Sequence, residues 1–104
     1  TLLGGEPFEP ENQRVLLPFL RRVKKTYPEK SIWAFSGFTL EELEAAGHPP
    51  NCEATSAMLG LIDVLVDGRF IEAKKDLSLR GSSNQRLIDM NQTRRKGRIV
   101  LWNG

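Results

Sequence analysis

The chain has 104 residues, enough for one domain with a single core and too few for a two-domain enzyme. Hydrophobic residues make up 39% and charged residues 27% of it, which is typical of a folded globular protein, and no apolar run approaches the ~20 residues of a membrane-spanning helix. The single cysteine excludes an internal disulfide and a metal site made of cysteines, and it favours a cytoplasmic location.

The formal net charge of +2 is unevenly distributed along the chain. Residues 1–68 carry six lysine and arginine residues against ten aspartate and glutamate residues, whereas residues 69–104 carry nine against three. The basic carboxyl-terminal part fits either a solvated tail or a surface for an acidic partner or a nucleic acid. Because aromatic residues do not interleave with these charges, the solvated tail is favoured over such a binding surface.

The first segment is an apolar run, residues 1–3, that breaks at Gly4 and Gly5 and meets Glu6 and Pro7. This pattern fits a tight turn from a strand to a helix, and it equally fits a ligand site at a strand end, where glycine lets a bound molecule approach the backbone. The chain starts in this strand-like segment without a methionine or a targeting sequence, so we expect a preceding part of a longer protein.

A helix is predicted next, starting near Glu11 or Asn12 and ending before Tyr27-Pro28. We expect Pro18 to kink it near its second turn. Apolar residues at helical spacing predict one buried face, made of Val15, Leu16, Phe19, Leu20 and Val23.

Residues 31–36 form a nearly continuous apolar run, which predicts a strand buried on both faces and ending at Gly37. The spacing of Thr39 and Glu42 is that of a capping box, so a short helix is predicted to follow. His48 lies beside two prolines and is predicted to be a solvated loop residue. Cys52 is predicted to be a packed or partly exposed thiol and not a nucleophile. Residues 54–61 are predicted to be helical.

The third predicted strand, residues 62–66, ends at Asp67, Gly68 and Arg69. The order of elements therefore predicts an α/β fold in which a parallel sheet has flanking helices and the strand ends share one edge. Ligands bind at that edge in such folds. Gly4, Gly5, Glu6, Ser36, Gly37, Asp67 and Arg69 would meet there, offering small residues, two carboxylates and a guanidinium to a polar ligand.

Residues 74–86 are polar and lack periodicity, which predicts a long loop of the kind that is often functional. Residues 87–90 and 99–102 are each predicted to be short strands. A basic turn at residues 93–98 would join them into a hairpin.

Four blocks of the sequence resemble the activating proteins of anaerobic ribonucleoside-triphosphate reductases, which belong to the glycyl-radical activase group of radical S-adenosylmethionine enzymes. The blocks are Leu3–Pro7, Trp33–Leu43, Ile62–Phe70 and Lys75–Arg86. The resemblance implies a partial (β/α) barrel and reductive cleavage of S-adenosylmethionine at a 4Fe-4S cluster. The resulting 5′-deoxyadenosyl radical would generate a glycyl radical on the large subunit of the reductase, with an electron donor such as flavodoxin.

The resemblance also implies roles for individual residues. Gly4, Gly5, Glu6 and Pro7 would hold the methionine amino group of S-adenosylmethionine. Ser36 and Gly37 would line the adenosyl or the methionyl side of the cofactor. Asp67 matches a D-x-K pattern in which Arg69 replaces the usual lysine. An arginine there would contact the carboxylate of S-adenosylmethionine through two hydrogen bonds. Basic residues of the following loop would contact the reductase or cover the cofactor: Lys74, Lys75, Arg80 and Arg86.

One part of the family pattern is absent from this sequence. The cluster ligands form a CxxxCxxC motif, which the chain lacks, and Cys52 alone cannot hold a cluster. The resemblance therefore implies that residues 1–104 are the carboxyl-terminal portion of the enzyme, a single domain that is catalytically silent alone. The alternative is a non-catalytic module that binds an acidic protein or a nucleic acid through its basic part. A nucleotide-binding fold is disfavoured because GxGxxG and GxxxxGK[ST] are missing.

Overall fold

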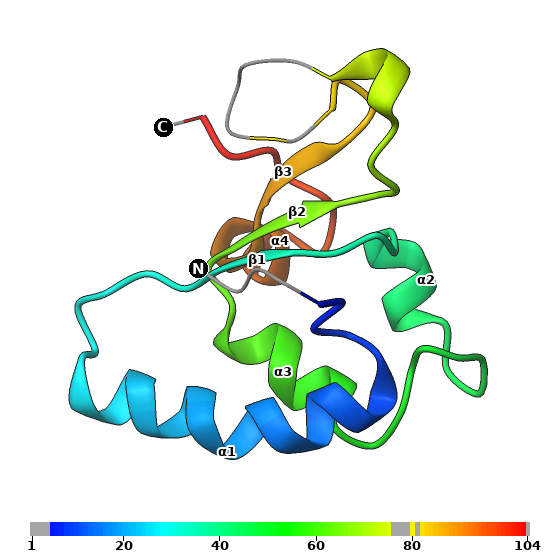
Figure 1. Cartoon of the computed structure of the whole chain (residues 1–104). Coiled ribbons are helices and arrows are strands. Elements are labelled where there is room, and N and C mark those ends of the chain that lie inside the picture. Colours follow the sequence, from blue (N-terminus) through cyan, green and yellow to red (C-terminus); the bar gives the residue numbers. More distant parts are fainter. Residues whose placement is uncertain (1–4, 76–79, 81, 104) are drawn as a thin grey trace.

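The computed structural model describes residues 5–75, 80 and 82–103 of the chain. Its elements are, in order, α1 (Pro10–Thr26), β1 (Trp33–Phe35), α2 (Leu40–Glu44), α3 (Thr55–Leu61), β2 (Val64–Asp67), the 3-10 helix η1 (Glu72–Lys74), β3 (Arg86–Asp89) and α4 (Met90–Lys96). Figure 1 shows α1 and α3 together below the sheet and the segment around η1 above it. The strand predicted at residues 1–3 lies outside the described residues.

The three described strands lie in the order β1-β2-β3. β1 and β2 are parallel, with Ala34 beside Leu65, whereas β2 and β3 are antiparallel, with Leu65 beside Ile88. The predicted parallel arrangement of the strands at residues 31–36 and 62–66 is therefore confirmed, whereas β3 joins them antiparallel and makes the described sheet mixed. The segment between β2 and β3 holds only η1 among the described elements and no crossover helix, so the chain returns beside β2 in the opposite direction.

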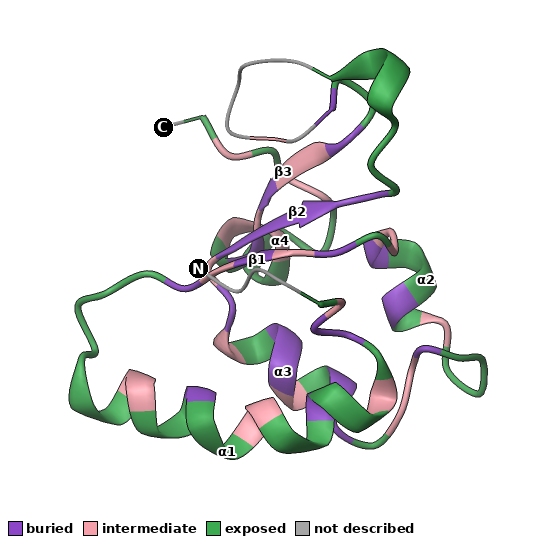
Figure 2. Ribbon diagram, in the orientation of Figure 1, coloured by how far each residue is buried: buried purple, intermediate pink, exposed green. Residues whose placement is uncertain are grey.

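One face of the sheet packs against the helices through Ala34, Leu65 and Ile88, which are each 0% exposed. β2, which lies between the other two described strands, is buried on both faces (Figure 2). In β1, by contrast, Trp33 and Phe35 are half-buried, so the prediction that this strand is buried on both faces is confirmed only in part. The Trp33 ring meets the Trp102 ring edge to face, with 4.9 Å between their centroids.

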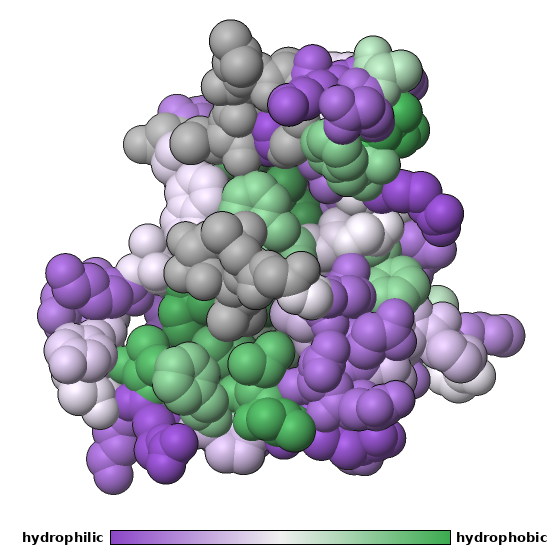
Figure 3. Space-filling model, viewed as in Figure 1, coloured by the Kyte–Doolittle hydropathy of each residue, from purple (hydrophilic) through white to green (hydrophobic). Residues whose placement is uncertain are grey.

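The buried side of α1 agrees in part with the predicted one, since Leu20 is buried and Leu16 and Val23 pack against the core. Gln13 and Leu20 are its buried residues, whereas Val15 is 74% and Phe19 49% exposed. Figure 3 shows hydrophobic side chains gathered on the lower part of the surface, where α1 lies. The helix begins at Pro10 and continues through Pro18, so the predicted start was one to two residues late.

Residues 90–96 form the helix α4, so the predicted hairpin with a basic turn was wrong. The Asp89 side chain accepts a hydrogen bond from the Gln92 amide at 2.9 Å and caps the first turn. Gly97, at φ 67°, ends the helix in the left-handed conformation that glycine adopts easily. A single bridge, between Ile88 and Leu101, replaces the predicted second strand.

The two short helices predicted in the middle of the chain, α2 and α3, are confirmed. In α2, the Thr39 side chain accepts from the Glu42 amide, and the Glu42 carboxylate accepts from the Thr39 amide, which completes the capping box. α3 covers the predicted 54–61 segment apart from its first residue. Among the described residues, no helix has the length and apolar character needed to cross a membrane.

Candidate functional site

Glu6 joins the segment before α1 to the end of β1. Its Oε1 accepts the Gly37 backbone N–H at 2.6 Å, and its Oε2 accepts the Ser36 hydroxyl at 2.9 Å. The Phe8 backbone N–H also donates to Oε2, at 2.9 Å. The Glu6 carboxylate therefore joins residues from two of the three predicted strand ends.

Ser36 is placed by the sheet itself. Its backbone N–H donates to the Val66 carbonyl at 2.9 Å, which extends the pairing of β1 with β2 by one residue. Its hydroxyl is buried, donates to Glu6 and accepts the Phe38 N–H at 3.1 Å. The position of Ser36 therefore follows from the strand pairing, and the chain turns immediately after it.

Asp67, the last residue of β2, is 1% exposed. Its carboxylate accepts the Leu40 backbone N–H at 2.7 Å and two hydrogen bonds from the Arg86 guanidinium, at 2.9 and 2.5 Å. The Leu40 N–H belongs to the first turn of α2, where a negative charge is favoured. Asp67 therefore anchors α2 to the end of the sheet.

Arg86 bridges two carboxylates. Besides Asp67 it contacts Glu41, with Nη2 at 2.6 Å from Oε1. The hydrogen bonds that Arg86 donates to Asp67 and then to Glu41 raise its pKa above the usual value. The same contact with Arg86 lowers the pKa of Glu41. Both shifts favour the charged forms of Arg86 and Glu41.

The segment after β2 is ordered by amide side chains. Gly68, at φ 100°, donates its N–H to the Phe38 carbonyl at 3.0 Å, and its carbonyl accepts the Gln85 side-chain amide at 2.7 Å. Arg69 is exposed, and its carbonyl accepts the Asn84 side chain at 2.8 Å. Of the predicted 74–86 loop, residues 76–79 and 81 lie outside the described residues, whereas Lys75 and Ser82 form an antiparallel bridge.

The structure brings only some of the predicted site residues together. Gly4 lies outside the described residues; Gly5 is exposed and Pro7 buried. Glu6 contacts Ser36 and Gly37 directly. Their roles toward a ligand remain predictions.

The contacts of Arg86 differ from the predicted ones. Arg86 was predicted to contact the reductase or to cover the cofactor, whereas its guanidinium binds Asp67 and Glu41. The signal was the register, since Arg86 stands directly opposite Asp67 on the antiparallel strand. An opposite-charge pair at such a position is a common cross-strand contact, but it becomes visible only once the strands are known to be antiparallel.

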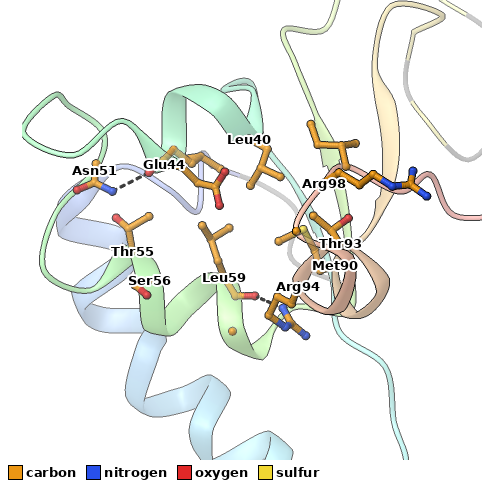
Figure 4. Close-up of a pocket in the computed structure, with 14 residues that line it drawn as sticks. Leu40, Glu44, Asn51, Thr55, Ser56, Leu59, Met90, Thr93, Arg94 and Arg98 are labelled. Atoms are coloured by element: carbon orange, nitrogen blue, oxygen red, sulfur yellow. Dashed lines mark hydrogen bonds between the residues drawn. The ribbon is translucent and has the colours of Figure 1, made fainter.

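A pocket of about 660 Å³ lies elsewhere, among α2, α3 and α4 (Figure 4). Leu40, Leu59 and Met90 are among its apolar lining residues. On its rim, Arg94 donates to the Leu59 carbonyl at 2.8 Å, and Asn51 donates to the Leu43 carbonyl at 2.7 Å. None of the predicted site residues lines this pocket.

The described residues do not provide the ligands of an iron–sulfur cluster. Cys52, the only cysteine in the sequence, is half-buried, and its Sγ lies 3.5 Å from Gln13 Oε1. No group of three or more His, Cys, Asp or Glu side chains in the described part of the chain is arranged to hold a metal. One cysteine does not fit a cluster that needs at least three protein ligands. His48 is exposed in its loop, as predicted.

Comparison with known proteins gives a consistent result. Residues 1–88 match the model of a family described as "4Fe-4S single cluster domain". The chain is 47% identical over 87 residues to the anaerobic ribonucleoside-triphosphate reductase-activating protein of Haemophilus influenzae, an alignment that covers 82% of this chain and 51% of the relative.

Two further relatives carry the same name. The protein of Pasteurella multocida is 45% identical over 94 residues, covering 88% of this chain and 56% of the relative. That of Escherichia coli K12 is 41% identical over 87 residues, covering 82% and 51%. The chain thus spans about half the length of the curated relatives it matches. No solved structure matches it significantly.

Proposed function

The chain belongs to the 4Fe-4S single cluster domain family, and from this membership we propose that it forms part of an activating enzyme for an anaerobic ribonucleoside-triphosphate reductase. The observation that carries the proposal is the 41–47% identity, over most of the chain, to proteins of that name. The proposed reaction is that of radical S-adenosylmethionine activases, in which the bound cofactor supplies the radical that removes a hydrogen atom from a glycine of the reductase.

In this proposal the chain contributes one side of the S-adenosylmethionine site. The edge formed by Glu6, Ser36 and Gly37 supports this assignment, because it lies at the carboxyl end of the parallel strand β1, where ligands of α/β sheets bind. Backbone atoms there are accessible: Gly5 is exposed, and a Cβ added to it would meet no atom within 4 Å. Gly4, Pro7, Asp67 and Arg69 complete the proposed set.

The proposal assigns the cluster ligands to a part of the activase other than residues 1–104. Anaerobic reconstitution of this chain with iron and sulfide should therefore yield far fewer than the roughly four iron atoms per chain of a complete cluster. The measurement is iron and sulfide analysis after desalting, with Cys52→Ala as the control for thiol-bound iron. A stoichiometric cluster in the unmodified chain would contradict this assignment.

We further propose that basic residues after β2 contact the reductase. Lys74 and Lys75 are exposed in the segment that Figure 1 shows above the sheet, and Arg80 is half-buried beyond them. Arg86 is left out of this surface because Asp67 and Glu41 occupy its guanidinium. Two exposed lysines are suited to steering an acidic surface toward this face.

The double variant Lys74→Glu/Lys75→Glu should weaken binding of the chain to the purified anaerobic reductase about tenfold or more at low salt, because two attractive charges become repulsive. Biolayer interferometry at two salt concentrations measures this. The double variant Arg22→Glu/Lys25→Glu, which changes the charge by the same amount at exposed residues of α1, is the matched control and should leave binding unchanged. Equal loss in both variants would show a general charge effect and remove the proposed surface.

A further inference from the structure

We infer that Glu6 is a positioning residue: its carboxylate holds the backbone of residues 5–8 against the turn at Ser36 and Gly37, and it is not the counter-ion of the ligand's ammonium group. This inference rests on the proposed function for the identity of the ligand. It rests on the hydrogen bonds of the described residues for the role of Glu6.

The first argument is the occupancy of the carboxylate. Two carboxylate oxygens offer about four acceptor positions in total. Three are filled by donors of this chain: the Gly37 N–H at 2.6 Å, and the Ser36 hydroxyl and Phe8 N–H at 2.9 Å each. Two of these donors lie some thirty residues away in sequence, so the carboxylate cross-links two segments.

The second argument is that these donors are fixed. The Ser36 side chain is 3% exposed, and its hydroxyl is also an acceptor for the Phe38 N–H. If Glu6 turned toward a ligand, this buried hydroxyl and the Phe8 N–H would both lose their acceptor. Buried donors without acceptors are costly, so the cross-linked arrangement is favoured over a swing of the side chain.

The third argument concerns which atoms remain for a ligand. The Glu6 main-chain carbonyl is itself engaged, accepting the Asn12 side chain at 2.8 Å and the Glu9 N–H at 3.3 Å. Gly5 is exposed next to this cross-linked residue and has open space where a Cβ would lie. The structure therefore assigns contact with the ligand to the backbone around Gly5, at a position that Glu6 fixes.

Glutamate is specifically suited to this role. Glutamine has the same length, but its amide nitrogen is a donor and would face a donor at one of the three contacts. The variant Glu6→Gln should therefore keep the fold and lose part of the cross-link. Ser36→Ala removes one donor from the same cross-link without touching the carboxylate.

The first part of the experiment tests the cross-link without any ligand. In the uniformly ¹³C,¹⁵N-labelled chain, the Gly37 amide nitrogen should show a through-hydrogen-bond coupling to the Glu6 side-chain carboxyl carbon. The control Glu9→Gln, an exposed residue that makes no capping bond to α1, should retain this coupling. Absence of the coupling in the unmodified chain would overturn the inference.

The second part measures binding of S-adenosylmethionine and S-adenosylhomocysteine by NMR titration. We expect Glu6→Gln to weaken both by about fivefold to tenfold, which is the effect of losing one hydrogen bond, and Ser36→Ala to weaken both by a smaller factor. The double variant should be no weaker than Glu6→Gln alone, because both changes break one cross-link. Additive losses, or unchanged affinity in Glu6→Gln, would overturn the positioning role. If the unmodified chain binds neither ligand although the coupling is present, the assignment of a ligand site to this edge of the chain fails and the cross-link stands.

Discussion

Replacing Asp67 with alanine should lower the free energy of unfolding by about 2–4 kcal/mol, because it removes the buried acceptor of three hydrogen bonds. The Leu40 N–H at the start of α2 would lose its partner in a buried environment. The Arg86 side chain is 33% exposed, so water can replace part of its lost hydrogen bonding. The loss of stability therefore stays below that of breaking a fully buried ion pair.

Glu41→Gln is the matched control for this change. Glu41 and Asp67 bind the same guanidinium, but the Glu41 side chain is 63% exposed whereas that of Asp67 is 1% exposed. Exposed ion pairs contribute little, so we expect Glu41→Gln to cost under about 1 kcal/mol. Urea denaturation followed by circular dichroism measures both variants. Equal losses from the two variants would show that burial of the pair does not determine its contribution.

The sequence contained enough information for the elements with a local signature. The capping box of Thr39 and Glu42 predicted α2, and the apolar run before Asp67 predicted a strand, because both patterns depend on residues close together in sequence. The contact between Glu6 and Ser36 also agrees with the prediction that these two residues meet at one edge of the sheet.

Other features depended on pairing that no local pattern specifies. Whether β3 runs parallel or antiparallel to β2 is set by the path of the intervening chain, and the contact between Asp67 and Arg86 follows only from that direction. The helix α4 did have a local signal, in Asp89 as its cap and Gly97 as its end. Its run of basic residues indicated a turn more strongly than those two residues indicated a helix.

The buried face of α1 includes a polar residue that its hydrophobic pattern did not predict. Gln13 is 0% exposed, although the pattern placed Val15 and Phe19 on the buried side. Its side-chain amide donates to the carbonyls of Phe8, at 2.8 Å, and of Pro50, at 3.1 Å. Each polar atom of the side chain has a partner, since its oxygen accepts the Thr55 hydroxyl at 2.6 Å.

Gln13→Ala should therefore destabilise the chain by about 2–4 kcal/mol, since it leaves a cavity and several buried polar groups without partners. At the size of this chain, such a loss corresponds to a melting temperature lower by about 10–25 °C. Differential scanning calorimetry measures it. Gln13→Leu fills the space but makes none of the side-chain hydrogen bonds. Its loss of stability therefore measures the contribution of the hydrogen bonds apart from that of the cavity.

Arg21→Ala, an exposed change on the same helix, should leave the melting temperature unchanged. If Gln13→Leu is as stable as the unmodified chain, the amide contributes nothing beyond its volume, and the argument for its burial fails. If Gln13→Leu is destabilised nearly as much as Gln13→Ala, the hydrogen bonds account for the burial. The same amide then fixes Phe8, whose N–H binds Glu6, so the interior of α1 and the edge of the sheet are held by one connected set of hydrogen bonds.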